Sequence, residues 1–178
     1  MLRTKGADIP ENLFQKWGRL ILIATTLALV MASVMNFLTG CIGAGPVVDG
    51  IVDHKIVTGI KDNTSYTILT NTPGDDGPYV LVKDSDYEGY FTIRDKNAII
   101  SESLENEIHG NYLQIKYLVS IRVESSDPIN NLVQGDTLAY FASRHDFNKV
   151  MIGDKIRYEV ARSVHSTIRR LLEVQGQD

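Results

Sequence analysis

Residues 112–123, with the sequence YLQIKYLVSIRV, decide the fold class of this chain. Hydrophobic side chains occupy every second position of the segment, at Leu113, Ile115, Tyr117, Val119, Ile121 and Val123. Polar residues occupy the positions between them, at Gln114, Lys116, Ser120 and Arg122, with Leu118 as the exception. A period of two is typical of a β-strand with one buried and one solvated face. The segment therefore predicts a β-sheet.

Short segments rich in β-branched and aromatic residues lie on both sides of this strand. We expect further strands at 51–57, 65–70, 79–82 and 90–93, and then at 137–142 and 155–160. The turn residues of 71–78 predict that 65–70 and 79–82 pair as a hairpin. Gly-Asp pairs precede the last two strands, at 135–136 and 153–154. Strands this short, with turns this frequent, predict a mainly β fold, a small OB-like barrel or a sandwich.

Helical spacing of hydrophobic residues appears in two places. Ile99, Ile100, Leu104 and Ile108 predict a short helix within 97–108. The tail, residues 159–174, fits a helix or a strand–turn–strand, and we favour a helix over 163–173. Residues 143–148 are polar and are expected to form a connection.

An uncharged apolar run, LILIATTLALVMASVMNFL, occupies residues 20–38. As a helix it would span roughly 28 Å, which matches a hydrocarbon core of about 30 Å. It predicts one N-terminal membrane-inserted helix. Four basic residues precede the run and no Lys or Arg follows it until Lys55. The positive-inside rule therefore places the N-terminus in the cytoplasm and the main domain outside the cytoplasmic membrane.

These features divide the chain into four expected parts. Residues 1–19 form a cytoplasmic lead, and 20–38 form a membrane helix or the hydrophobic region of a signal peptide. Residues 39–50 form a flexible linker that includes Gly43 and Pro46. Residues 51–178 form an extracytoplasmic β domain.

Cys41 is the only cysteine, which excludes an intramolecular disulfide. The sequence Leu38-Thr39-Gly40-Cys41 resembles the lipobox of prokaryotic lipoproteins, bacterial or archaeal. This resemblance implies cleavage before Cys41 and lipidation of its thiol. The alternative is an uncleaved single-pass anchor, because the apolar run is longer than the 7–15 residues of a usual signal peptide. Ala24, Ala28 and Ala32 would then form a small-residue stripe suited to helix contacts.

Residues 150–156, VMIGDKI, and the hairpin before them resemble the small OB-like barrels of exported prokaryotic lipoproteins. The usual ligands of OB-folds are oligonucleotides or oligosaccharides. The chain has a net charge of −4, which argues against a nucleic-acid partner because phosphate binding needs a basic face. The expected partners are the lipid bilayer and other envelope proteins or glycans.

One acidic segment, residues 84–95, partly follows the spacing of an EF-hand calcium loop. Its carboxylates at Asp84, Asp86, Glu88 and Asp95 would supply the oxygen ligands, and Gly89 the sharp turn. The alternative is a solvated acidic hairpin turn. We expect no cofactor other than this calcium.

Two further surface sites follow from the sequence. Tyr79, Tyr87, Tyr90 and Phe91 lie close together in the chain and predict a ligand-binding aromatic patch. Asn63-Thr64-Ser65 is an N-glycosylation sequon on a predicted turn.

Catalytic signatures are absent from the sequence. The histidines at 54, 109, 145 and 165 have no partner three or four residues away, and HExxH, GxSxG and phosphate-loop motifs are missing. We therefore expect a non-enzymatic, membrane-tethered binding or structural module of the cell envelope. The alternative is a single-pass subunit of a larger membrane or surface assembly.

Overall fold

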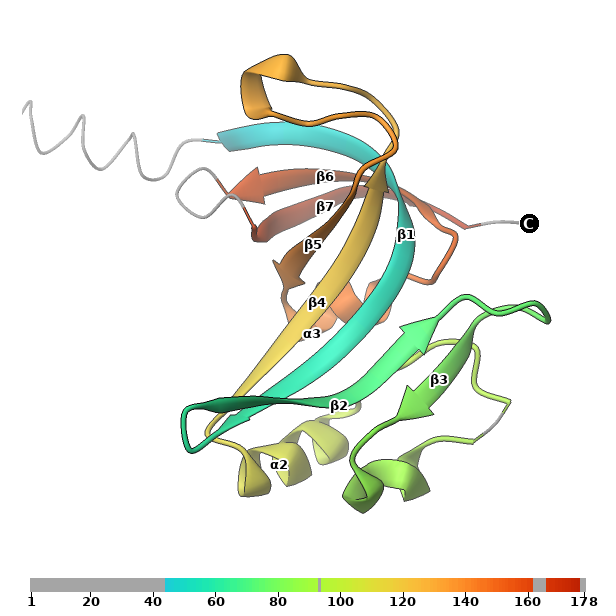
Figure 1. The fold of residues 1–178 in the computed structure, drawn as a ribbon, viewed down its shortest axis with the longest axis vertical. Coiled ribbons are helices and arrows are strands. Elements are labelled where there is room, and N and C mark those ends of the chain that lie inside the picture. The colour runs from blue at the N-terminus through green and yellow to red at the C-terminus, as the bar shows by residue number, and fades with distance from the viewer. Residues whose placement is uncertain (1–43, 93, 162–165, 177–178) are drawn as a thin grey trace, which may run out of the picture. The chain divides into compact units, whose positions relative to one another are not determined.

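The computed structural model of the protein describes residues 44–92, 94–161 and 166–176 (Figure 1). These residues form a seven-stranded antiparallel sheet with a few short helices, which confirms the mainly β prediction. Within these ranges no helix has the length and apolar character needed to cross a bilayer. The predicted membrane segment 20–38 and Cys41 lie outside the described residues.

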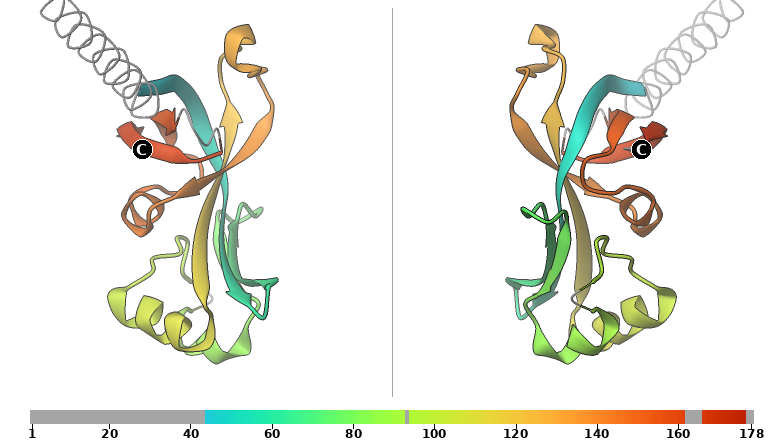
Figure 2. Two further views of the ribbon diagram at one scale, coloured as in Figure 1. Left: turned by 90° about the vertical axis from the view of Figure 1, so that its left-hand side faces the viewer. Right: turned by 90° about the vertical axis from the view of Figure 1, so that its right-hand side faces the viewer.

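One long strand organises the sheet. The strands are β1 (Ala44–Lys61), β2 (Thr64–Thr72), β3 (Tyr79–Val82), β4 (Gln114–Val123), β5 (Thr137–Ala142), β6 (Lys155–Ala161) and β7 (Ile168–Gln175). β4 pairs with one edge of β1 over 50–60. The other edge is shared, because β6 pairs with residues 44–51 and β2 with residues 55–61. β3 extends the sheet beyond β2, β5 beyond β4 and β7 beyond β6 (Figures 1 and 2).

The strand β4 confirms the alternation seen in the sequence. Its buried residues are Tyr117, Val119, Ile121 and Val123, as the pattern predicts. The helices α2 (Glu102–Asn111) and α3 (Arg144–Lys149) contact β4, and the ring of Phe147 packs 5.4 Å from that of Tyr117. Because these side chains meet between sheet and helices, they form the centre of the core.

The predicted turns are also present. The β2–β3 hairpin pairs Leu69 with Val82, as expected. Asp62 and Asn63 both have positive φ, which is typical of a two-residue hairpin turn between β1 and β2. Gly153 has φ of 92°, a conformation in which glycine avoids a steric penalty, and the tight turn leads directly into β6.

The predicted linker is wrong over residues 44–50, which form the beginning of β1. Val48 lies opposite Tyr158 of β6, and both side chains are buried. The glycines and proline of this segment predicted a flexible connection, but pairing with β6 makes it a strand.

The tail is a strand rather than the favoured helix. Residues 168–175 pair with β6, and Ile168 and Leu171 pack into the core. The ladder contains two register shifts. They allow hydrophobic residues that are spaced as in a helix to face the core from a strand. The open edge of β6 therefore overrides local preference, since strand pairing depends on a partner as well as on the segment itself.

Local capping explains the other differences from the sequence predictions. Residues 85–90 form a 3₁₀ helix, η1 (Ser85–Tyr90), whose first turn is capped by the Asp84 carboxylate. Of the strand predicted at 90–93, the described residues 90–92 are not in a strand. Ser101 caps α2, so the helix begins five residues later than predicted. Ser143 likewise caps α3, which replaces the expected polar connection.

Buried polar side chains fix the irregular segment 96–100 against the sheet. The Lys55 ammonium group donates to Asn97 Oδ1 at 2.6 Å, to the Ala98 carbonyl at 3.0 Å and to the Val150 carbonyl at 2.9 Å. Asn71 accepts from the Ala98 amide at 2.9 Å. Residues 96–100 make no strand-to-strand hydrogen bonds, and these side-chain hydrogen bonds hold them to the sheet instead. They also satisfy polar groups that would be costly to bury without a partner.

The sheet curves so that its outer strands approach each other. The Phe141 amide of β5 donates to the Ser166 carbonyl at 2.6 Å, and Phe141 forms a single parallel bridge with Thr167. Among the described residues the ladders do not close further, and they form neither a closed barrel nor a two-sheet sandwich in this part of the chain.

Candidate ligand-binding groove at the distal hairpin

Two adjoining hollows lie at the end of β1 opposite Ala44. They measure about 330 and 450 Å³ and share Lys61, Asp62, Asn111 and Tyr112. We call them together the distal groove. The β1–β2 turn forms one wall and the C-terminal end of α2 forms the other. The Leu113 amide donates to the Ile60 carbonyl at 2.8 Å, which joins the two walls.

Tyr112 is the fixed aromatic element of the distal groove. Its ring lies against the backbone of Gly59, and its hydroxyl donates to Asp84 Oδ2 at 2.7 Å. Burial and the neighbouring Asp84 carboxylate raise the pKa of this hydroxyl, so it stays protonated and keeps donating. The ring is therefore held in place at both ends.

Tyr66 is the accessible aromatic element. Its ring centroid lies 6.2 Å from that of Tyr112 at an interplanar angle of 54°, and 46% of its surface is exposed. Asp86 and Asn111 line the hollows beside these rings. Aromatic faces next to carboxylate and amide groups suit a ligand with both C–H and hydroxyl surfaces.

The four aromatic residues predicted as one patch are divided by the structure. Tyr87 is fully buried in the core and accepts from Asn111 Nδ2 at 2.9 Å, while Phe91 packs partly against the core. Tyr79 lines a separate hollow with Arg94 and Lys96. Tyr90 is exposed and its hydroxyl donates to Glu107. The prediction of a single exposed patch is wrong, because η1 turns Tyr87 inward.

The predicted calcium ligands hold other partners. Asp84 caps η1 and accepts from Tyr112, and Asp95 accepts from the Thr92 amide at 2.6 Å. Asp86 and Glu88 lie in the first turn of η1. In the described ranges no three His, Cys, Asp or Glu side chains gather as a metal site. Asn63 of the sequon is exposed on the β1–β2 turn and lines the distal groove.

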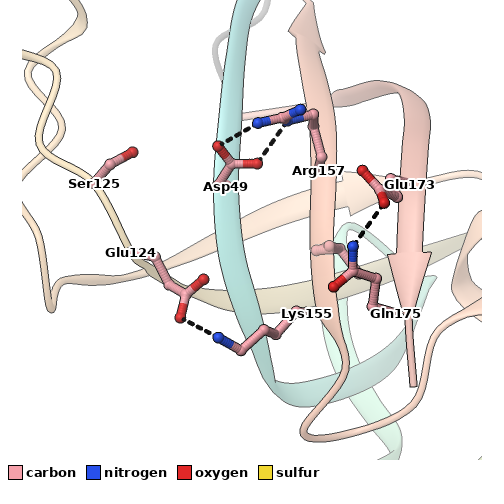
Figure 3. Close-up of a pocket in the computed structure, with 8 residues that line it drawn as sticks. Asp49, Glu124, Ser125, Lys155, Arg157, Glu173 and Gln175 are labelled. Carbon is pink, nitrogen blue, oxygen red and sulfur yellow. Dashed lines mark hydrogen bonds and ion pairs between the residues drawn. The ribbon is translucent and has the colours of Figure 1, made fainter. Parts of the chain in front are cut away.

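A further hollow, of about 460 Å³, lies where β1, β6 and β7 meet (Figure 3). Four of its five charged side chains form ion pairs. Asp49 accepts two hydrogen bonds from Arg157, at 2.8 and 3.2 Å, and Lys155 lies 3.3 Å from Glu124. The remaining charged side chain, Glu173, accepts from Gln175 Nε2 at 2.6 Å. Because each of these polar groups already has a partner, this hollow offers a ligand less than the distal groove does.

Lys55 is the residue with unusual chemistry that the sequence did not reveal. Burial lowers its pKa to about 7, although the nearby Asp154 carboxylate acts in the opposite direction. Its ammonium group also lies 4.3 Å from the centre of the Phe147 ring. The side chain is fully buried and lines none of the hollows described above, so its contacts are structural.

Comparison of the chain with protein-family models, with curated proteins and with solved structures gives no match.

Proposed function

We propose that the protein is a membrane-tethered, extracytoplasmic binding module of the cell envelope. One observation carries this proposal: the apolar run of residues 20–38 ends only six positions before Ala44, where the folded β domain begins. A connection this short keeps the domain against the membrane surface. The lipobox-like sequence ending at Cys41 supplies a lipidation site within the same connection.

An OB-like fold is part of the same proposal. β1 pairs with β4 and β6, β4 pairs with β5, β6 pairs with β7, and one parallel bridge links β5 to residue 167. This order supports a partly open, five-stranded barrel of the OB type. The β2–β3 hairpin and α2 are then an insertion between the first two barrel strands. OB-folds bind ligands with the loop at this position, and here the insertion contributes most of the distal groove.

Glycans are the ligand class that the distal groove supports best. A sugar ring can pack its C–H face on Tyr66, while its hydroxyls bond Asp86 and Asn111. The acidic net charge of the chain makes an oligonucleotide the less suitable of the two OB ligand classes.

The tether is tested by the intact mass of protein extracted from its native membrane. A mass that begins at Cys41 with a diacylglyceryl group supports a lipoprotein. A full-length mass from the membrane fraction supports a single-pass anchor and favours the alternative, a subunit of a larger assembly. Recovery of unmodified protein from the soluble fraction contradicts the tether.

The ligand class is tested on a glycan array with matched variants. Tyr66→Ala removes the accessible ring of the distal groove, whereas Tyr90→Ala removes a similarly exposed ring outside it. We expect only Tyr66→Ala to lose binding. If both variants bind like the parent protein, the groove is not the glycan site.

A further inference from the structure

The connection between β4 and β5, residues 124–136, projects from the end of the sheet at which β1 begins (Figures 1 and 2). β4 runs antiparallel to β1 and ends at Val123, opposite Gly50. The Glu124 amide still donates to the Asp49 carbonyl at 3.0 Å before the chain leaves the sheet. The tip of this connection therefore lies at the end of the sheet from which the proposed tether leaves.

Hydrogen bonds within the tip hold its conformation. Asp127 accepts from the amides of Ile129 and Asn130 at 3.0 and 3.3 Å, and from the Asn130 side chain at 2.6 Å. Asp127 and Leu132 exchange two backbone hydrogen bonds of 2.9 Å each, and Leu132 is buried. The tip thus has a fixed base below the 3₁₀ helix η2 (Pro128–Asn130).

This fixed tip presents hydrophobic side chains to solvent. Ile129 is 91% exposed and Val133 is 56% exposed. Val47, near the beginning of β1 at the same end of the sheet, is 53% exposed. A single exposed apolar residue needs no explanation, whereas an ordered tip that exposes two of them, with a third at the same end of the sheet, is suited to an apolar partner.

The length of the preceding chain identifies that partner. Ala44 follows Cys41 by three positions and Leu38 by six. Even fully extended, these connections reach only about 10 and 20 Å. Either form of tether therefore holds the beginning of β1 close to the bilayer surface.

We infer that the tip of residues 127–133 inserts Ile129 and Val133 into the interfacial region of the bilayer, as a second membrane contact. This inference rests on the proposed tether. Insertion is driven by apolar burial, because the tip carries acidic Asp127 and no basic residue. Zwitterionic lipid is therefore sufficient, and raising the salt concentration should not release the tip.

Tryptophan quenching in vesicles tests the inference. The full chain carries Trp17→Phe, which removes its only tryptophan, and either Ile129→Trp or Leu113→Trp. Leu113 is a matched control because it is 84% exposed at the opposite end of β1. Both proteins are reconstituted into phosphatidylcholine vesicles with bromine on the acyl chains near the headgroup. Flotation of the vesicles on a density gradient reports the tether separately.

We expect both proteins to float and only the tryptophan at position 129 to lose fluorescence, because an interfacial contact buries its ring roughly 5–10 Å into the headgroup/acyl boundary, beside the bromine. Flotation with unquenched fluorescence at 129, or with equal quenching at both positions, overturns the second contact and leaves the tether intact. Failure of both proteins to float overturns the tether and the inference together.

Discussion

The Tyr112 ring occupies the space that a side chain at Gly59 would need. A Cβ at Gly59 would come within 2.4 Å of two carbons of that ring. The aromatic wall of the distal groove therefore requires a glycine at position 59, and the pair links the central strand β1 to the proposed ligand site.

Gly59→Ala should displace Tyr112 and break its hydrogen bond to Asp84. We expect the free energy of unfolding to fall by about 1–3 kcal/mol, the usual cost of overpacking. Urea denaturation measures this change. Gly110→Ala is the control, because a Cβ there meets nothing within 4 Å. It should leave stability unchanged or raise it by up to about 1 kcal/mol. Equal effects of the two variants would contradict the packing described for Tyr112.

Tyr87→Ala should destabilise the fold strongly, because the ring is fully buried among core residues. We expect a loss of about 3–5 kcal/mol, as for other buried aromatic rings. Tyr90→Ala should keep the urea midpoint close to that of the parent protein, since its ring is exposed. A small effect of Tyr87→Ala would show that η1 does not turn this residue inward.

Lys55 should make stability depend on pH in the alkaline range. Burial lowers its pKa to about 7 in the folded protein, whereas an unfolded lysine titrates near 10.5. Between these values the unfolded chain binds the extra proton, so stability should rise with pH, at most by about 1.4 kcal/mol per unit. The comparison is the free energy of unfolding at pH 7 and pH 9, for the parent protein and for Lys55→Met.

The difference between these two proteins isolates Lys55 from other titrating groups. We expect the rise with pH in the parent protein and not in Lys55→Met. The variant should also be less stable at every pH, because three buried oxygen acceptors lose their donor. An identical pH dependence in the two proteins would mean that the hydrogen bonds keep the ammonium charged and its pKa normal.

Asp127→Ala should loosen the tip of the β4–β5 connection without unfolding the domain. Hydrogen bonds from Asn130 and Ile129 lower the pKa of Asp127, so its ionised form stabilises the tip. This stabilisation is present above the ordinary pKa of a carboxyl group and is lost as the pH falls through the lowered value. Amide exchange of Ile129 and Asn130 should be faster in the variant. Asp136→Ala, at the end of the same connection, should leave these two rates unchanged.

The sequence predicted those strands in which hydrophobic and polar side chains alternate, and those that are bounded by clear turn residues. The segment 112–123 is an example, because burial of every second residue requires only that one face meets the core. The β2–β3 hairpin is another, since its turn residues leave few alternatives. The tail could not be predicted in this way: its hydrophobic spacing suits a helix, and only the free edge of β6 makes it a strand.

The distal groove was not predicted because it depends on contacts between distant segments. Tyr66, Asp84 and Tyr112 come from a strand, a cap and a helix end, and no local pattern joins them. Neighbours in the sequence instead suggested Tyr87 as a surface residue. Lys55 was equally hidden, because a lysine in a strand is normally solvated and its acceptors lie 42 to 95 residues away.

The position of β1 determines how the domain would resist mechanical load. The proposed tether before Ala44 would pull on β1 along its own axis, while a partner held by Tyr66 of β2 and Asn111 of α2 would pull these neighbouring elements in the opposite direction. Ladder hydrogen bonds run perpendicular to the strands, so this force shears many of them together instead of opening them one at a time. β4, β6 and β2 all share the load through their pairing with β1. A domain built this way would transmit tension between membrane and ligand without unravelling from its anchored end.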